Sequence, residues 1–174
     1  YHIAMFHLFT HAFFKALLFL GAGSVIHAFQ EEQDITKMGG VWKKIPYTMI
    51  LMLIGTLALT GFPFLSGFYS KDAIIEFAYL KGTSIGYYTC SVGVFTAFLT
   101  AIYSWRLFFK TFFGEYNNKS IPIEKTHESP LVMIIPLIML AIGALAAGYL
   151  FKDLFIGNNS TFWGETILFL NFIK

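Results

Sequence analysis

Residues 46–80 read PYTMILMLIGTLALTGFPFLSGFYSKDAIIEFAYL and form one apolar segment that is too long for a single straight helix across a membrane. A helix of about 35 residues would reach about 50 Å, whereas the hydrocarbon core of a bilayer is about 30 Å thick. The segment must therefore be interrupted. The motif GFPFLSG at 61–67 marks the place, because Pro63 lacks a backbone N–H and crowds the carbonyl of Leu59, while two glycines relax the backbone.

Two ionisable residues, Lys71 and Asp72, follow this interruption. A broken helix in lipid is tolerated where protein or water satisfies the freed backbone groups, and this arrangement recurs at transport sites. We expect the second half-helix to begin near Ser70, so that its positive end favours Asp72 as an anion and disfavours Lys71 as a cation. The alternative is that Gly-Phe-Pro only ends a membrane span, with both residues at an ordinary aqueous boundary.

The composition of the whole chain is that of a membrane protein. Of its 174 residues, 56% are hydrophobic and 13% are charged, whereas about 25% are charged in an average soluble domain. The net charge of +2, without a long charged run, argues against nucleic acid as a partner, and Cys90 has no second cysteine for a disulfide or a cluster. These features predict an all-α, polytopic transmembrane helix bundle with one discontinuous helix.

Four apolar segments reach the length of about 20 residues that a spanning helix needs. The predicted spans cover about 3–29, 45–80, 87–113 and 131–151, within a bundle of residues 1–155, and residues 156–174 are predicted to form a loop and the start of a further helix. The loops after the first and third spans are rich in lysine, which places them in the cytoplasm or matrix. We expect the second of these loops, at about 114–130, to be solvated, and the first residue, Tyr1, indicates a piece of a longer chain.

The first span carries three titratable side chains at four-residue intervals, His7, His11 and Lys15. On a helix these positions form one narrow stripe that rises about 12 Å along the axis. Ionisable groups in a bilayer normally face the protein interior or a hydrated cavity, where they mark an ion or proton pathway. Histidine suits a proton relay because it titrates near neutral pH and has two ring nitrogens. The stripe therefore predicts a relay.

Two other interpretations of the stripe stay open. The histidines could be hydrogen-bonded packing residues, as single histidines in membrane helices often are. Histidines at positions i and i+4 could also chelate a metal ion, but no HExxH motif and no third acidic ligand accompany them. The sequence therefore predicts no metal site.

Three motifs occur in a characteristic order: HLFTHAFFKALLFLGAGSVIHA at 7–28, QDITKMGGVWKKIP at 33–46 and LTGFPFLSGFYSKDAIIE at 59–76. Together they closely resemble the antiporter-like membrane subunits of respiratory NADH:quinone oxidoreductase, complex I. The resemblance is strong from Met5 to about Lys81 and looser beyond. It implies a fragment of the later part of such a subunit, because the earlier glutamate and lysine sites of the family lie outside this stretch.

The resemblance also implies a function. In the family a central hydrophilic axis carries protons, and the relay positions map onto His7, His11, Lys15, Lys71 and Asp72. No cofactor is expected in this chain, because flavin, iron–sulfur clusters and quinone are expected in other subunits. The expected partners are other membrane subunits of complex I, the lipid bilayer and protons, in the bacterial cytoplasmic membrane or the mitochondrial inner membrane.

Two other functions stay open. The first is a subunit of an Mrp-type multisubunit cation/proton antiporter, which shares the stripe and the broken helix. The second is a structural membrane spacer, in which the same side chains are merely hydrogen-bonded.

Overall fold

The computed structural model describes residues 1–118, 122–157 and 162–163 and is helical without strands over these residues. The all-α prediction is confirmed. The further helix expected within 156–174 lies largely outside the described residues. The helices are α1 (His2–Ala28), α2 (Pro46–Thr60), α3 (Ser66–Leu80), α4 (Ser84–Phe112) and α5 (Leu131–Ile156), with one 3-10 turn, η1 (Ile123–Lys125).

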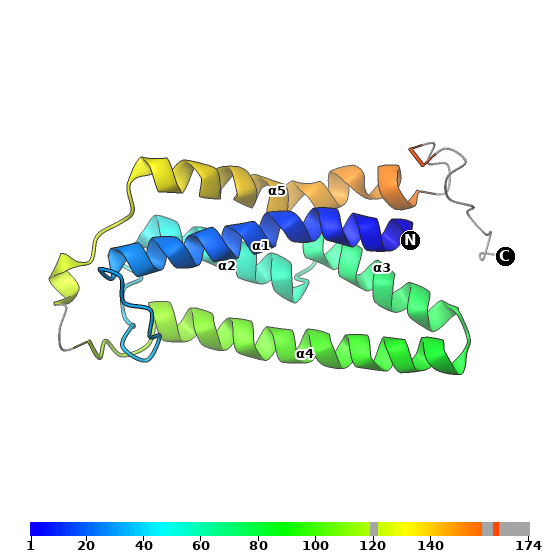
Figure 1. The fold of residues 1–174 in the computed structure, drawn as a ribbon, viewed down its shortest axis with the longest axis horizontal. Coiled ribbons are helices and arrows are strands. Elements are labelled where there is room, and N and C mark those ends of the chain that lie inside the picture. Colours follow the sequence, from blue (N-terminus) through cyan, green and yellow to red (C-terminus); the bar gives the residue numbers. More distant parts are fainter. Residues whose placement is uncertain (119–121, 158–161, 164–174) are drawn as a thin grey trace.

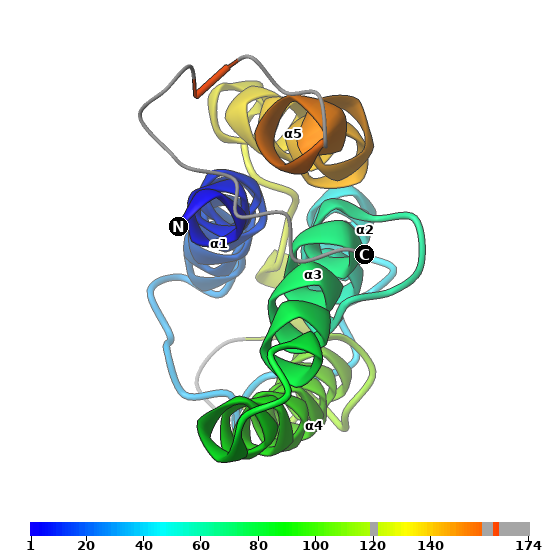
Figure 2. The same ribbon diagram turned by 90° about the vertical axis from the view of Figure 1, so that its right-hand side faces the viewer.

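The helices lie roughly parallel or antiparallel along one long axis (Figure 1). Helices α2 and α3 follow each other end to end and together run alongside α1. Seen along the bundle, α5 and α4 lie at opposite edges, with α1, α2 and α3 between them (Figure 2). Helix α1 packs against α2, α3 and α5, so the predicted stripe of titratable residues belongs to a helix with three neighbours.

The apolar core has two parts. One lies where α1, α2 and α5 meet, and the other lies where α1, α2 and α4 approach the loop between α1 and α2. The first contains Phe14, Leu17, Leu51, Ala58, Leu59, Ile134, Leu137, Ala141 and Ala144, and the second contains Val25, Ala28, Phe29, Met38, Val41, Ile45, Met52, Phe108 and Phe112.

Three helices are long and apolar enough to cross a bilayer: α1 with 27 residues, α4 with 29 and α5 with 26. Helix α2 has 15 residues and is too short to cross alone. Most of α4 is uncovered, and large side chains such as Ile85 and Phe95 are 74% and 61% exposed. An apolar face of this size needs a nonpolar environment, which lipid or further protein can supply.

The long second segment is interrupted where the sequence predicts it. Helix α2 ends at Thr60, and Gly61 adopts a left-handed conformation with φ of 81°. The N–H of Gly61 then bonds to the carbonyl of Ala58 at 3.3 Å, and the N–H of Phe62 bonds to that of Leu57 at 3.0 Å. This is a Schellman motif, and it requires glycine because other residues are strained at such a φ. The predicted discontinuous helix is therefore confirmed.

The start of the second half-helix differs from the prediction. Helix α3 begins at Ser66, so Ser70 lies in its second turn and does not cap it. The effect of a helix terminus falls off within the first turn. The expected influence of this terminus on Lys71 and Asp72 is therefore absent, because both residues lie beyond that turn.

The first turn of α3 packs tightly against two other backbones. The hydroxyl of Ser66 bonds to the carbonyls of Gly143, at 3.1 Å, and Ala144 in α5. A side chain at Gly67 would collide with the carbonyl of Ala58 in α2, and one at Gly148 in α5 would collide with Ser66. The break therefore lies where α2, α3 and α5 touch.

Candidate functional site

The predicted stripe on α1 is partly buried and its members interact. The imidazole rings of His7 and His11 lie 5.6 Å apart, measured between centroids. The amine of Lys15 lies 5.8 Å from the ring centroid of Phe19. Lys15 lies one helical turn beyond His11, and Lys71 follows Ser70 of α3, whose hydroxyl contacts His7. The structure therefore brings His7 and His11 together on α1 and joins His7 to the turn of α3 that carries Lys71.

His7 is tied to α3 through two fully buried hydroxyls. Its Nδ1 lies 2.9 Å from Oγ of Ser70, and Oγ1 of Thr10 donates to the same oxygen at 2.8 Å. Both hydroxyl residues have no exposed surface. Sequence reasoning missed this role of Ser70, although a serine next to Lys71 in an apolar helix is a signal that a polar partner lies opposite.

Lys71 binds the end of the preceding half-helix. Its Nζ donates to the carbonyl of Leu59 at 2.7 Å. In a continuous helix this carbonyl would accept from residue 63, but Pro63 has no N–H, so the ammonium replaces the missing donor. The carboxyl end of a helix carries partial negative charge and stabilises a cation. The expectation that a helix terminus disfavours Lys71 as a cation is therefore wrong, because the terminus that it meets is the carboxyl end of α2.

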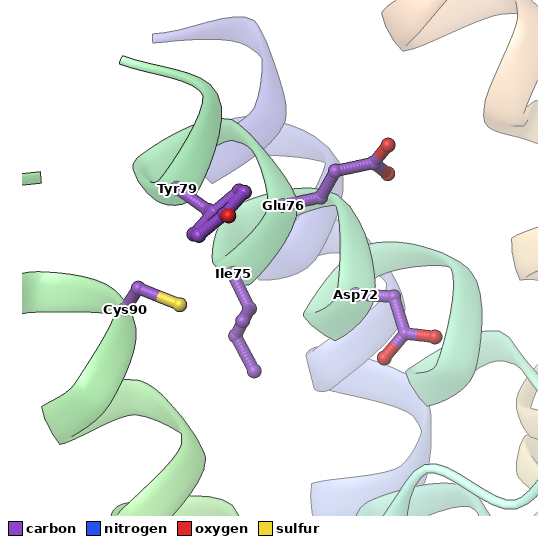
Figure 3. A pocket seen from close by; sticks show the side chains of 5 residues that line it. All are labelled: Asp72, Ile75, Glu76, Tyr79 and Cys90. Carbon is purple, nitrogen blue, oxygen red and sulfur yellow. The ribbon is translucent and has the colours of Figure 1, made fainter. Parts of the chain in front are cut away.

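Asp72 follows Lys71 on α3, and its side chain lines a pocket. It lies with Glu76 in an open pocket between α3 and α4, which Ile75, Tyr79 and Cys90 also line. Figure 3 shows the two carboxylates on the same side of α3, with Ile75 and Tyr79 on the side that faces Cys90. In the described part of the chain, Lys71 and Asp72 form no ion pair. Glu76 is a second carboxylate beside Asp72 in this pocket, and its spacing of four residues on a helix was the available signal in the sequence.

A second polar cluster lies near the other end of α1 and joins α1, α2 and the loop before α5. Ser24 Oγ lies 2.9 Å from Oγ1 of Thr48 and donates to Oγ of Ser129 at 2.6 Å. The carboxylate of Glu128 accepts from Oγ1 of Thr48 at 2.5 Å and from the N–H of Tyr47 at 2.8 Å. We call Ser24, Thr48, Glu128 and Ser129 the glutamate cluster, and His7, Thr10, Ser70 and Lys71 the histidine cluster.

The glutamate cluster corrects the expectation that the loop at 114–130 is simply solvated. Helix α2 begins at Pro46, and its N-cap residue, Ile45, makes no side-chain hydrogen bond to it. Free N–H groups in a first turn need acceptors, and an anion suits that position. The loop supplies the acceptor through Glu128. Glu128 and Thr48 are 80 positions apart in the sequence, so the local sequence carries no signal for this contact.

The described residues contain no group of three or more His, Cys, Asp or Glu side chains that could hold a metal ion. The two clusters are built from hydroxyl, imidazole, amine and carboxylate groups. Such groups can hold, donate and accept protons.

The fold and the hydrogen bonds between α1 and α3 define a polytopic helical membrane protein with a polar seam between these two helices. Residues 1–100 match the family described as "NADH:quinone oxidoreductase/Mrp antiporter, TM". This stretch is more than half of the chain, and the chain belongs to that family.

The relatives show which members it resembles. The chain is 49% identical over 170 residues to NADH-ubiquinone oxidoreductase chain 5 of Marchantia polymorpha, covering 98% of this chain and 25% of the relative. It is 51% identical over 170 residues to the protein of the same name from Arabidopsis thaliana, covering 98% and 25%. It is 50% identical over 169 residues to NADH-quinone oxidoreductase subunit L of Rhodobacter capsulatus, covering 91% and 23%. The predicted resemblance is confirmed, and the chain spans about a quarter of the length of these relatives.

Proposed function

We propose that this chain is a segment of a proton-translocating membrane subunit of NADH:quinone oxidoreductase, in which His7, His11, Lys15, Lys71 and Asp72 carry protons. Its place is the mitochondrial inner membrane or the bacterial cytoplasmic membrane, beside other membrane subunits of the complex. The redox cofactors belong to those other subunits. One observation carries the proposal: Nδ1 of His7 in α1 lies 2.9 Å from Oγ of Ser70 in α3, next to Lys71, whose amine binds the end of the interrupted helix α2.

Protons would pass along His7, His11 and water between Lys15 and Lys71, and from there to Asp72. Charges inside a protein interact more strongly than in water. A change of charge on one lysine therefore alters the proton affinity of the histidines that it faces. The pocket that holds Asp72 and Glu76 opens at the surface of the described chain, which suits a step that delivers or receives the proton.

Lys71 has two tasks in this scheme. As an ammonium it satisfies the carbonyl of Leu59 at the carboxyl end of α2. When it gives up its proton, the favourable interaction with that helix end weakens. The amine is then free to turn toward the histidines of α1. The broken helix thus links the charge of Lys71 to its position.

The test is a pair of substitutions in the full-length subunit within its assembled complex, reconstituted into vesicles. Lys71→Ala removes the proton carrier, and Lys71→Arg keeps a permanent cation that can still bind the carbonyl of Leu59. We expect both variants to lose about tenfold or more of NADH-driven proton pumping, because neither can exchange a proton at this position. Lys81→Ala is the matched control, since Lys81 is an exposed lysine at the end of the same helix.

Normal pumping by either Lys71 variant, at normal assembly, would reject the assigned role. Loss of pumping in Lys71→Ala together with normal pumping in Lys71→Arg would also reject the role, because a permanent cation would then be sufficient for pumping. The Lys81→Ala variant should pump and assemble as the unchanged protein does.

The family description also names Mrp antiporters. Ion-gradient measurements with and without NADH separate the two functions, because only the oxidoreductase couples proton movement to NADH oxidation. A structural spacer is separated by the combined replacement of His7 and His11, after which a spacer would leave pumping unchanged.

A further inference from the structure

Ser70 is the one oxygen that His7, Thr10 and the backbone of α3 share. Its Oγ lies 2.9 Å from Nδ1 of His7, 2.8 Å from Oγ1 of Thr10 and 3.3 Å from the carbonyl of Ser66. Ser70 and Thr10 are fully buried, so water does not replace these contacts in the described chain. The directions of the three hydrogen bonds therefore decide which ring nitrogen of His7 holds a proton.

A serine hydroxyl has one proton to donate and two lone pairs that accept. Oγ1 of Thr10 lies 2.8 Å from Ser70 and farther from the carbonyls of Phe6 and His7, at 3.2 and 3.1 Å, so its single proton goes to Ser70. The carbonyl of Ser66 can only accept, so the contact at 3.3 Å uses the single proton of Ser70. The two lone pairs then accept from Thr10 and from Nδ1 of His7. All three contacts are satisfied together only if Nδ1 carries a proton and donates it.

This assignment does not change with the charge of the ring. A neutral imidazole with its proton on Nδ1 and a cationic imidazole both present an Nδ1–H to Ser70. The hydroxyl bonds lead on only to a backbone carbonyl, which does not take up a proton, so this side of the ring is closed to proton transfer. Nε2 has no hydrogen-bond partner in the described part of the chain, and the ring of His11 lies 5.6 Å away on the next turn.

We propose that Ser70, oriented by Thr10, is a positioning residue that keeps a proton on Nδ1 of His7 and so makes Nε2 the nitrogen through which His7 exchanges protons. The proposal rests on the proton relay proposed above. It assigns a tautomer to His7 and names the ring nitrogen through which His7 takes part in the relay. The proposal also gives a reason for the buried serine next to Lys71. The same turn of α3 orients His7 through Ser70 and carries Lys71.

The tautomer is measured directly by infrared spectroscopy of the full-length subunit in its complex, labelled with ring-13C histidine. The band of His7 is isolated as the difference between the unchanged protein and His7→Asn. We expect the neutral ring to carry its proton on Nδ1, and Ser70→Ala to shift it to Nε2 because the acceptor is lost. A neutral ring with its proton on Nε2 in the unchanged protein overturns the proposal.

Proton pumping in vesicles supplies the second readout. We expect Ser70→Ala to lower NADH-driven pumping by about fivefold to tenfold, the size of one lost hydrogen bond to a titrating group. Ser104→Ala is the control, because Ser104 is a buried helical serine whose hydroxyl has no partner in the described residues. Normal pumping and an unchanged His7 band in Ser70→Ala overturn the proposal.

His7→Asn separates this proposal from the function on which it rests. Its short amide can still bind Ser70 but cannot titrate. If His7→Asn pumps normally, His7 is not a relay group and the proposed function fails at that position. If His7→Asn loses pumping while Ser70→Ala retains both pumping and the tautomer, the relay stands and the role of Ser70 is wrong.

Discussion

The two polar clusters on α1 are built from similar parts and differ in what their titratable group is free to do. In the glutamate cluster the carboxylate of Glu128 accepts from the hydroxyl of Thr48 and from two backbone N–H groups of α2. In the histidine cluster, His7 uses Nδ1 alone, and its second nitrogen has no partner in the described residues. The carboxylate of Glu128 therefore has a structural role, because all of its hydrogen bonds depend on its negative charge. The imidazole of His7 has an unused nitrogen and can exchange a proton there.

The hydroxyls show the same difference. In the glutamate cluster, Thr48 donates to an anion and Ser129 donates to the carbonyl of Ser24, so adding a proton to Glu128 would break a charge-assisted bond. In the histidine cluster the hydroxyls keep their bonds whether or not Nε2 is protonated. We therefore expect changes in the glutamate cluster to lower stability, and changes in the histidine cluster to lower transport.

The largest expected loss of stability follows from Glu128→Ala. It leaves the first turn of α2 and the hydroxyl of Thr48 without their acceptor, at a cost of about 3 kcal/mol. Glu128→Gln keeps an acceptor without the charge and should cost about 1 kcal/mol. The measurement is the midpoint of thermal inactivation of the assembled complex. Loss of pumping per assembled complex, at normal stability, would contradict the comparison and make Glu128 a transport residue.

A smaller effect is expected from Thr48→Val, which keeps the shape of the side chain and removes its hydroxyl. Ser24 loses one partner and Glu128 loses one donor, at a cost of about 1 kcal/mol. Pumping per assembled complex should stay normal, in contrast to Ser70→Ala. Vesicle pumping and thermal inactivation, measured on both variants side by side, check this. Equal loss of pumping in the two variants would erase the distinction between the clusters.

The smallest effect is expected at the exposed pair Glu32–Lys37 in the loop between α1 and α2, whose charged atoms lie 2.9 Å apart. The hydrogen bond from Lys37 lowers the pKa of Glu32, and the same bond raises the pKa of Lys37. Any stabilisation is therefore present near neutral pH, fades as pH falls through the lowered pKa of Glu32, and fades again above the raised pKa of Lys37.

Because water and salt screen an exposed pair, Glu32→Gln should leave the thermal midpoint within error of the unchanged protein. A loss as large as that of Thr48→Val, persisting in high salt, would show that this loop has a role that its exposure does not indicate.

Much of the fold follows from local sequence. The interruption at 61–67 was predictable because segment length, Pro63 and Gly61 all act on the nearby backbone. The stripe of His7, His11 and Lys15 was predictable because helical periodicity depends only on spacing. The division into apolar helices follows from composition in the same way.

What the sequence did not reveal depends on contacts between distant residues. Ser70 meets His7 63 positions away, and Ser129 meets Ser24 105 positions away. Helix α3 starts at Ser66, in place of the expected Ser70, and Ser66 is bonded to Ala144 of α5, 78 positions away. Lys71 stabilises the end of α2 only because the loop between α2 and α3 brings the second turn of α3 beside Leu59, and helical periodicity carries no information about that loop.

The close approach at Ser66, Gly67 and Gly148 has a mechanical consequence. Three backbones touch there without intervening side chains, and Ser66 is bonded to α5. The joint between α2 and α3 cannot open like a hinge unless α5 separates from it, which would leave a buried hydroxyl without its acceptors. Charge movement past this joint should thus proceed by the turning of side chains such as Lys71, on a backbone that holds still.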